Sequence, residues 1–379
     1  MKQLLLSALI VTLVLLSAAC SGGSKTSAIK ENASDTLVFR YAANISVVKH
    51  ADFTEVALRN PWDTLKTLHT YLLVDKHQRA PESLPQGTVV NIPLEKSLIY
   101  SSVHCSLLKD LTSLSAIAGV CDRSYIRMPE IQEGCVNGTI QDCGSSMNPN
   151  IEKIIDLSPD AVLLSPFENS GGYGRIEKLG IPLIECADYM ETSPLGRAEW
   201  MRFFGLLYGK EQVADSLFSE IEKEYLSLKE QTAQEASKQP SVITEMKFGS
   251  AWYVPGGKST VARLLQDAGA NYLFADNASS GSVPLSFETV FDKGQHADYW
   301  LIKYNQPSDK KYSELATDYA PYKNFDAWKG QHIYGCNTSK VSFYEESPFH
   351  PERLLKDLIK IFHPELLPTY ELVYYSPLK

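Results

Sequence analysis

The chain has 379 residues, of which 44% are hydrophobic and 21% are charged, a length that accommodates two domains of ordinary size. Its formal net charge is −9 at pH 7. An acidic chain is repelled by phosphates, so we expect no nucleic acid partner.

The first twenty residues have the pattern of a secretory signal. A basic residue precedes an apolar run that is too short to span a membrane, and small residues then lead into Cys20. The segment resembles a bacterial lipoprotein signal, in which cleavage leaves Cys20 to carry the lipid, although Ser17 stands where such signals usually have Leu. We therefore expect a signal peptide at 1–19, a lipidated tether at 20–35, and a periplasmic protein anchored by lipid to a bacterial membrane.

Six cysteines remain after Cys20, and an exported chain meets an oxidising compartment in which disulfides form. Cys135 and Cys143 flank a glycine-containing turn, so one interpretation is a bridge between them. The alternative is that several of the six are buried thiols. Cys-x-x-Cys spacing is absent, which gives little support to a thioredoxin-like or zinc-ribbon interpretation. The six are Cys105, Cys121, Cys135, Cys143, Cys186 and Cys336.

Residues 36–90 alternate apolar and polar side chains, as half-buried strands do, and predict a small antiparallel β extension. From about residue 92 onward, short apolar strands alternate with helical segments, which predicts a parallel sheet covered by helices. We assign 36–205, extension included, to an N-terminal lobe.

The longest helical stretch follows the first lobe. Gly209 is expected to break it, and the segment from Lys210 to about Ser237 lacks Gly and Pro. A helix of that length is about 40 Å long and can run along a whole domain. We predict a linker helix at 206–239 and a C-terminal lobe at 240–379.

One segment occurs twice, once in each lobe. Each copy has a short helix, then an aspartate that begins an apolar strand, then a loop. The helix at 150–157 leads to Asp160, and the looser copy at 286–292 leads to Asp298. We interpret both aspartates as turn and cap residues that belong to the scaffold.

The order of several short motifs resembles the periplasmic substrate-binding proteins of ABC importers for metal chelates, namely iron siderophores, haem and cobalamin. The resemblance covers roughly residues 92–368. The motifs that carry it are Asn150 to Ile154, Ser158-Pro159-Asp160, Leu179 to Pro182, Trp252-Tyr253 with Pro255 to Ser259, Ala268 to Asn271, and Phe362 to Glu365.

This resemblance implies an α/β fold of two Rossmann-like lobes with parallel sheets, joined by one long α-helix, with the β extension outside the family pattern. It implies a monomeric, non-enzymatic protein without a cofactor, whose partners are a metal chelate and an ABC permease and ATPase. In the family, each lobe usually presents one surface glutamate to the permease. Here Glu168 lies near the expected place in the first lobe, whereas Lys258 occupies the place in the second.

Ligands of open α/β sheets bind outside the carboxyl ends of strands, and the loops at those ends carry aromatic and polar residues here. Facing aromatic rings suit a large, flat, partly apolar ligand. We expect the cleft to be lined by Arg123, Tyr125, Arg127, Phe167, Trp252, Tyr253, Tyr304, Phe343 and Tyr344. Lys303, Glu346 and His104 are weaker candidates, because a lone charged or imidazole group is more often structural.

Other functions have less support. A zinc or manganese site needs clustered His and carboxylate ligands, and the eight histidines are scattered. Sequence motifs for a nucleophile elbow, a metalloprotease helix or a phosphate loop are missing. The alternative that stays open is an exported two-lobed enzyme or cofactor-holding lipoprotein that uses the same cleft. The sequence does not name the chelate, although the few basic residues in the cleft loops disfavour highly anionic catecholates, and the aromatic residues suit cobalamin or haem.

Overall fold

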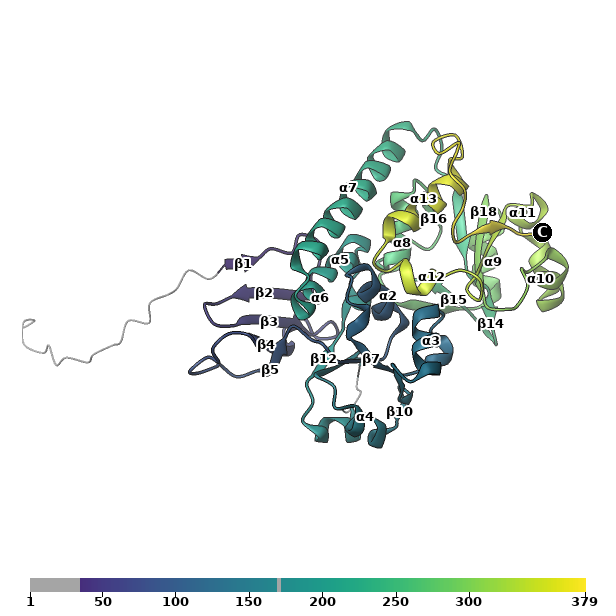
Figure 1. The fold of residues 1–379 in the computed structure, drawn as a ribbon. Helices are drawn as coiled ribbons and strands as arrows, with labels where there is room; N and C mark the ends of the chain where they lie inside the picture. The colour runs from purple at the N-terminus through teal and green to yellow at the C-terminus, as the bar shows by residue number, and fades with distance from the viewer. Residues whose placement is uncertain (1–34, 169–171) are drawn as a thin grey trace, which may run out of the picture. The chain divides into compact units, whose positions relative to one another are not determined.

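The computed structural model describes residues 35–168 and 172–379. The expected signal peptide and Cys20 lie outside the described residues. Within the described part, every helix is too short or too polar to cross a membrane. Residues 35–379 form one compact unit (Figure 1).

The β extension is a five-stranded sheet in the order β1-β2-β3-β4-β5. The pairings from β1 to β4 are antiparallel, as expected, but β5 pairs parallel with β4. The long connection after β4 carries the chain back along the sheet, so β5 enters in the same direction. The strands are β1 (Asp35–Leu37), β2 (Ile45–Lys49), β3 (Thr54–Arg59), β4 (Thr67–Asp75) and β5 (Thr88–Ile92).

Buried carboxylates hold the extension on the rest of the chain. The Glu199 side chain is completely buried and accepts hydrogen bonds from the backbone N–H groups of Arg40, Tyr41 and Ala42 at 2.8–2.9 Å. Glu191 accepts in the same way from Asn44 at 2.9 Å. Because a buried carboxylate is stable only when its oxygens are hydrogen-bonded, these contacts fix the segment that leads into β2.

The first lobe has a fully parallel sheet in the order β12-β11-β6-β7-β8. Its strands are β6 (Ser97–Ile99), β7 (Ile117–Val120), β8 (Gln141–Asp142), β11 (Ala161–Leu164) and β12 (Leu183–Glu185), with a separate small pair, β9 (Gly144–Ser145) and β10 (Asn148–Pro149). Its helices are α2 (Ser102–Asp110), α3 (Pro129–Asn137) and α4 (Ile151–Leu157), with 3₁₀ turns η1 (Leu114–Ala116), η2 (Arg123–Tyr125), η3 (Gly174–Leu179) and η4 (Asp188–Met190).

Three helices connect the lobes: α5 (Pro194–Glu199), α6 (Met201–Tyr208) and α7 (Glu211–Glu235). Gly209 adopts a left-handed conformation (φ 62°) between α6 and α7, so the expected break is confirmed. Helix α7 has 25 residues and a length of about 37 Å. It packs on α6 at one end and on α8 and α13 of the second lobe at the other, as Figure 1 shows.

The second lobe has a sheet in the order β16-β13-β18-β19-β20, parallel except for β20, and a small antiparallel sheet β14-β15-β17. Its strands are β13 (Ser241–Thr244), β14 (Lys247–Phe248), β15 (Ala251–Pro255), β16 (Asn271–Tyr272), β17 (Ser282–Leu285), β18 (Tyr299–Tyr304), β19 (Ile333–Asn337) and β20 (Ser376–Pro377). Its helices are α8 (Thr260–Asp267), α9 (Phe287–Gly294), α10 (Tyr312–Asp318), α11 (Asp326–Lys329), α12 (Phe343–Glu346) and α13 (Pro351–Phe362), with the 3₁₀ turn η5 (Ala320–Asn324). Trp252, which is expected to line the cleft, belongs to strand β15.

The repeated aspartates have equivalent structural roles. Asp160 precedes β11 and accepts hydrogen bonds from the backbone N–H groups of Glu95 and Lys96, just before β6. Asp298 precedes β18 and accepts from the backbone N–H of Ser241, the first residue of β13. Each aspartate therefore ties the start of its own strand to the start of the neighbouring strand, which confirms the scaffold interpretation.

The six cysteines of the described part are free thiols, so the bridge between Cys135 and Cys143 is not formed in this structure. Cys135 lies on α3, whereas Cys143 is buried after β8. Burial raises the pKa of Cys105 to about 12, which is typical of an inert core thiol.

Candidate functional site

The first lobe has a cavity of about 360 Å³ at the carboxyl ends of its parallel strands. The chain passes from β6 to β7 on one side and from β11 to β12 on the other, so the strand order reverses between β6 and β11. Ligands of open α/β sheets bind at such a switch point. The cavity, here called the switch-point cavity, is lined by Tyr100, Ser101, Ser102, Asp122, Tyr125, Ile126, Ser146, Met147, Leu164, Ser165, Phe167 and Tyr173.

Large apolar side chains at this cavity are exposed to solvent. Tyr125 is 76% exposed, Met147 is 83% exposed and Phe167 is 51% exposed. The three come from separate loops, and neighbouring exposed apolar groups of this size are typical of binding sites. The expected ligand residues Tyr125 and Phe167 are thus brought together at one cavity.

The inner wall of the switch-point cavity is polar. It carries four serines and the Tyr100 hydroxyl, which is buried without an oxygen or nitrogen partner among the described residues. Burial raises the pKa of Tyr100, and the Cys121 thiol beside it is only a weak hydrogen-bonding group. Hydroxyl groups donate and accept, so this wall suits a ligand with oxygen or nitrogen atoms at its edge.

Asp122 is the one charged side chain among the described residues that line the cavity. It has a left-handed backbone (φ 50°), which asparagine and aspartate tolerate better than most residues. Its carboxylate accepts hydrogen bonds from the backbone N–H (3.1 Å) and the hydroxyl of Ser146. These contacts fix the loop that carries Met147.

The two arginines expected to line the cleft have other partners. Arg123 Nε donates to Gln132 Oε1 at 3.0 Å, on α3. Arg127 Nη1 donates to the backbone oxygen of Thr338 at 2.9 Å and so joins the first lobe to the loop after β19. Neither residue lines the switch-point cavity, so the expectation that both contact the ligand is not supported for this conformation.

The second lobe places an ion pair at the carboxyl ends of its own strands. Glu245 follows β13 in a left-handed conformation (φ 66°) and pairs with Lys303 of β18. Burial lowers the pKa of Lys303, but the Glu245 carboxylate outweighs burial and the pKa is raised. Lys303 Nζ lies 5.8 Å from the ring centroid of Phe343, which is almost buried, while the neighbouring Tyr344 is half exposed. Of the aromatic pair, Tyr344 is the one available to a ligand.

Trp252 and Tyr304 belong to the interior, which corrects their expected place at the cleft surface. Trp252 has no exposed surface; its Nε1 donates to Thr244 O at 2.9 Å and its ring packs 5.5 Å from that of Trp300. The alternation of β15 turns Trp252 inward and leaves Tyr253 half exposed on the other face. The Tyr304 hydroxyl accepts from the backbone N–H of Lys310 at 3.0 Å.

The weaker candidates also have structural partners. His104 is buried, lies 3.0 Å from Asp188 and packs against Phe204. Glu346 pairs with Arg353 at 3.1 Å. The residues that the structure describes contain no group of three or more His, Cys, Asp or Glu side chains placed to hold a metal ion.

Sequence reasoning missed Tyr100, Met147 and Tyr173. Tyr100 directly follows β6, the first parallel strand. The rule that ligands bind at the carboxyl ends of parallel strands, here called the carboxyl-end rule, would have identified Tyr100 if it had been applied to this strand as well. Met147 lies between β9 and β10, which have two residues each and are too short to show a sequence pattern. The Tyr173 hydroxyl bonds to Glu185, which in turn contacts His69 of the distant extension.

Comparisons with known proteins agree with this arrangement. Residues 114–339 match the sequence family described as Periplasmic binding protein. An uncharacterized lipoprotein of Methanocaldococcus jannaschii is 27% identical over 355 residues, which are 87% of this chain and 83% of that relative.

Solved structures share the fold. A periplasmic heme binding protein from Pseudomonas aeruginosa aligns with a TM-score of 0.56 and 15% identity, covering 72% of this chain and 93% of that chain. The molybdate periplasmic binding protein of Haemophilus influenzae aligns with a TM-score of 0.58 and 14% identity. The alignment covers 75% of this chain and 90% of that chain. The β extension precedes the part that matches the family.

Proposed function

The chain belongs to the periplasmic binding protein family, and on this premise we propose that it captures a metal chelate between its two lobes and delivers it to an ABC permease. The switch-point cavity is the observation that carries the proposal. It is lined by the exposed aromatic rings of Tyr125 and Phe167 and by several side-chain hydroxyl groups. Rings of this kind stack on flat, partly apolar ligands such as cobalamin, haem or a ferric siderophore.

The charges at the site favour a chelate with little net negative charge. Of the lining residues that the structure describes, Asp122 is charged and none is Lys, Arg or His. On the second lobe, Lys303 is neutralised by Glu245. A highly anionic chelate would meet a carboxylate without a compensating cation, which is costly in a site that excludes water. We therefore favour cobalamin or an uncharged ferric chelate over a catecholate.

The proposed mechanism is binding, without covalent chemistry. Helix α7 packs on both lobes, and Arg127 and His350 each form a hydrogen bond from one lobe to the other. These contacts limit the motion of the lobes to a small hinge, which differs from the wide closure of proteins with flexible strand linkers.

We also propose that the protein is a monomer held outside the cytoplasm by lipid on Cys20. The uncharacterized archaeal relative is named a lipoprotein, which supports this anchoring. Glu168 is exposed beside Phe167 and is available to contact a permease. The second lobe offers Lys258 in the corresponding place, so we expect docking to differ from a symmetric pair of glutamates.

Calorimetric titration of the full chain tests the function. The panel is aquocobalamin, haemin, an uncharged ferric trishydroxamate and an anionic ferric triscatecholate, with molybdate as an oxyanion control. We expect at least one low-charge chelate to bind with micromolar or better affinity. If no chelate binds, the proposed function is wrong. If the triscatecholate binds most tightly, the argument for a low-charge ligand is wrong, but the proposal that the protein captures a chelate is retained. Turnover of a bound chelate would favour the alternative of an exported enzyme.

A further inference from the structure

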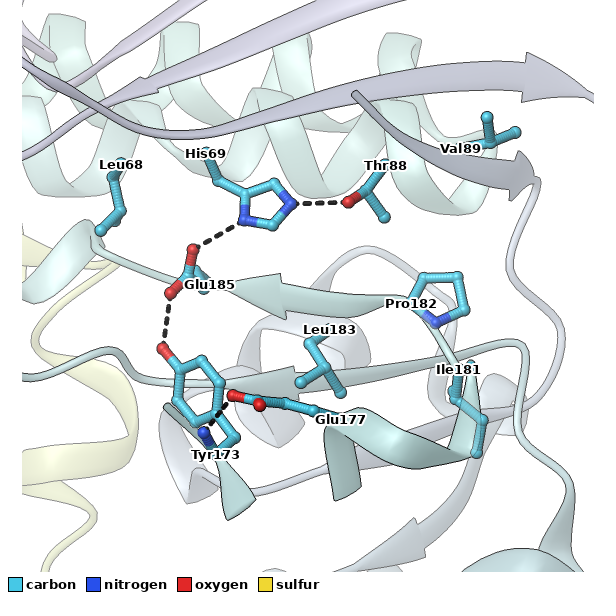
Figure 2. A pocket seen from close by; sticks show the side chains of 11 residues that line it. Leu68, His69, Thr88, Val89, Tyr173, Glu177, Ile181, Pro182, Leu183 and Glu185 are labelled. Carbon is cyan, nitrogen blue, oxygen red and sulfur yellow. Dashed lines mark hydrogen bonds and ion pairs between the residues drawn. The ribbon is translucent and has the colours of Figure 1, made fainter. Parts of the chain in front are cut away.

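A second cavity, of about 600 Å³, lies between the β extension and the edge of the first lobe (Figure 2). Strands β4 and β5 form one wall, and η3 with the edge strand β12 forms the other. We call it the extension cavity. Its first wall, at 68–89, precedes the residues that match the family. The cavity therefore depends on a part of the chain to which the proposed function gives no role.

A hydrogen-bonded network crosses the extension cavity from wall to wall. His69 Nδ1 lies 3.0 Å from Glu185 Oε2, and His69 Nε2 lies 2.7 Å from Thr88 Oγ1. From the other side, the Tyr173 hydroxyl donates to Glu185 Oε1 at 2.6 Å, as Figure 2 shows. Burial and then the bond to Glu185 raise the pKa of Tyr173, so its hydroxyl keeps its proton and donates.

The backbone beneath Glu185 is fixed as well. Tyr71 of β4 is completely buried; its hydroxyl donates to Leu183 O at 2.9 Å and accepts from Glu185 N–H at 2.8 Å. These are the outward-facing backbone groups of the edge strand β12. The Tyr71 side chain of the extension thus forms hydrogen bonds with the outward-facing backbone groups of β12. The Glu185 carboxylate is therefore held in one position before any ligand arrives.

The extension cavity has a negative field. Glu185 is 92% buried, and Glu177, which accepts from the backbone N–H of Tyr173, is a second carboxylate on the same cavity. The described residues that line the cavity include no Lys or Arg, and His69, which pairs with Glu185, still leaves the two carboxylates with a net charge of −1 when it is protonated. Two carboxylates at a recess attract a cation, and their pull is stronger there than on an open surface.

The rest of the lining is apolar, which points to an organic cation. Ile181, Pro182 and Leu183 line the cavity beside the network (Figure 2). A bare metal ion gains nothing from such a wall, and the described residues hold no metal-binding cluster. The volume lies within the range of about 300–1,000 Å³ that is usual for small-molecule sites.

We propose that the extension cavity is a second binding site, which takes a small organic ammonium ion with its charge at Glu185 and Glu177 and its carbon chain on Ile181 and Pro182. This site is separate from the switch-point cavity and does not rest on the chelate function. It gives the β extension a role in ligand binding.

A series of probes that differ only in charge tests the proposal on the unaltered full chain. Saturation-transfer NMR with n-butylammonium, n-butanol and n-butanoate compares charges of +1, 0 and −1 on the same apolar chain. We expect n-butylammonium to bind about tenfold or more tightly than n-butanol, and n-butanoate to bind least. Equal binding of the three, or no binding of n-butylammonium, overturns the proposal. Displacement of n-butylammonium by Mg²⁺ or Ca²⁺ at equal concentration overturns it in favour of a metal site.

Matched variants locate the site. Glu185→Gln keeps the shape of the side chain and removes its charge, and we expect n-butylammonium affinity to fall about tenfold. Glu82→Gln removes an exposed carboxylate of the extension and is expected to leave affinity unchanged. Tyr173 also lines the switch-point cavity, so it is left intact. If Glu185→Gln binds n-butylammonium as tightly as the wild type, the ammonium site is not at Glu185. If that variant fails to fold, the comparison of the three probes on the unaltered chain still tests the proposal.

Discussion

Asp110 of α2 in the first lobe and His350 before α13 in the second lobe lie within hydrogen-bonding distance, with Asp110 Oδ2 3.1 Å from His350 Nε2. Glu352 Oε1 lies 3.0 Å from the other ring nitrogen, and the imidazole is almost completely buried. Burial lowers the pKa of His350, but the two carboxylates outweigh burial and raise it from 6.5 to about 9, while Arg353 opposes them. A protonated histidine thus joins the lobes.

This junction predicts a loss of stability at alkaline pH. Because the folded pKa of about 9 exceeds the unfolded value of 6.5, the stabilisation is fully present below pH 6.5 and is lost as pH rises through 9. It amounts to at most about 3 kcal/mol. Urea unfolding of the wild type and His350→Gln between pH 6 and 10 checks this. The difference between their free energies of unfolding is expected to shrink with pH, and a constant difference contradicts the assignment.

The buried Glu199 predicts that the β extension depends on a carboxylate far away in sequence. Glu199→Ala leaves the backbone N–H groups of Arg40, Tyr41 and Ala42 without their acceptor, so we expect a loss of about 3 kcal/mol or more. Limited proteolysis should then cut within 35–92 sooner than in the wild type. The control is Glu220→Ala, which removes an exposed carboxylate of α7. Equal behaviour of the two variants contradicts the docking role.

The interior position of Trp252 predicts a change in stability without a change in ligand affinity. Trp252→Phe loses the hydrogen bond to Thr244 O and part of the contact with Trp300, which costs about 1–3 kcal/mol. Thermal unfolding measures the loss. Chelate titration well below the unfolding temperature is expected to match the wild type. A large fall in affinity with the fold intact would restore Trp252 to the ligand site.

Local sequence patterns predicted the scaffold well. The long run without Gly or Pro predicted α7, Gly209 predicted the break before α7, and the repeated helix–aspartate–strand segment predicted equivalent positions for Asp160 and Asp298. These features depend on residues close together in the chain, or on strand starts that any parallel sheet brings together.

The candidate site was harder to predict because side-chain partners are distant. Arg127 bonds to Thr338, 211 residues away, and no local pattern announces it. Trp252 is expected to line the cleft, whereas pairing of β15 with β17 makes it part of a strand that turns the ring inward. Exposed Tyr125 and Phe167 were found because they follow parallel strands, for which the carboxyl-end rule is sufficient.

Titration of the full chain and of the double variant Tyr125→Ala/Phe167→Ala with the best-bound chelate tests the central claim most directly. Both rings are largely exposed, so their removal is expected to leave the free energy of unfolding within about 0.5 kcal/mol of wild type. Affinity is expected to fall about tenfold or more, since each lost aromatic contact costs roughly 0.5–1.5 kcal/mol beyond its buried area. Phe248→Ala, which removes an exposed ring from β14 in the second lobe, is expected to bind like the wild type. Wild-type affinity in the double variant, or an equal loss in Phe248→Ala, would contradict capture at the switch-point cavity.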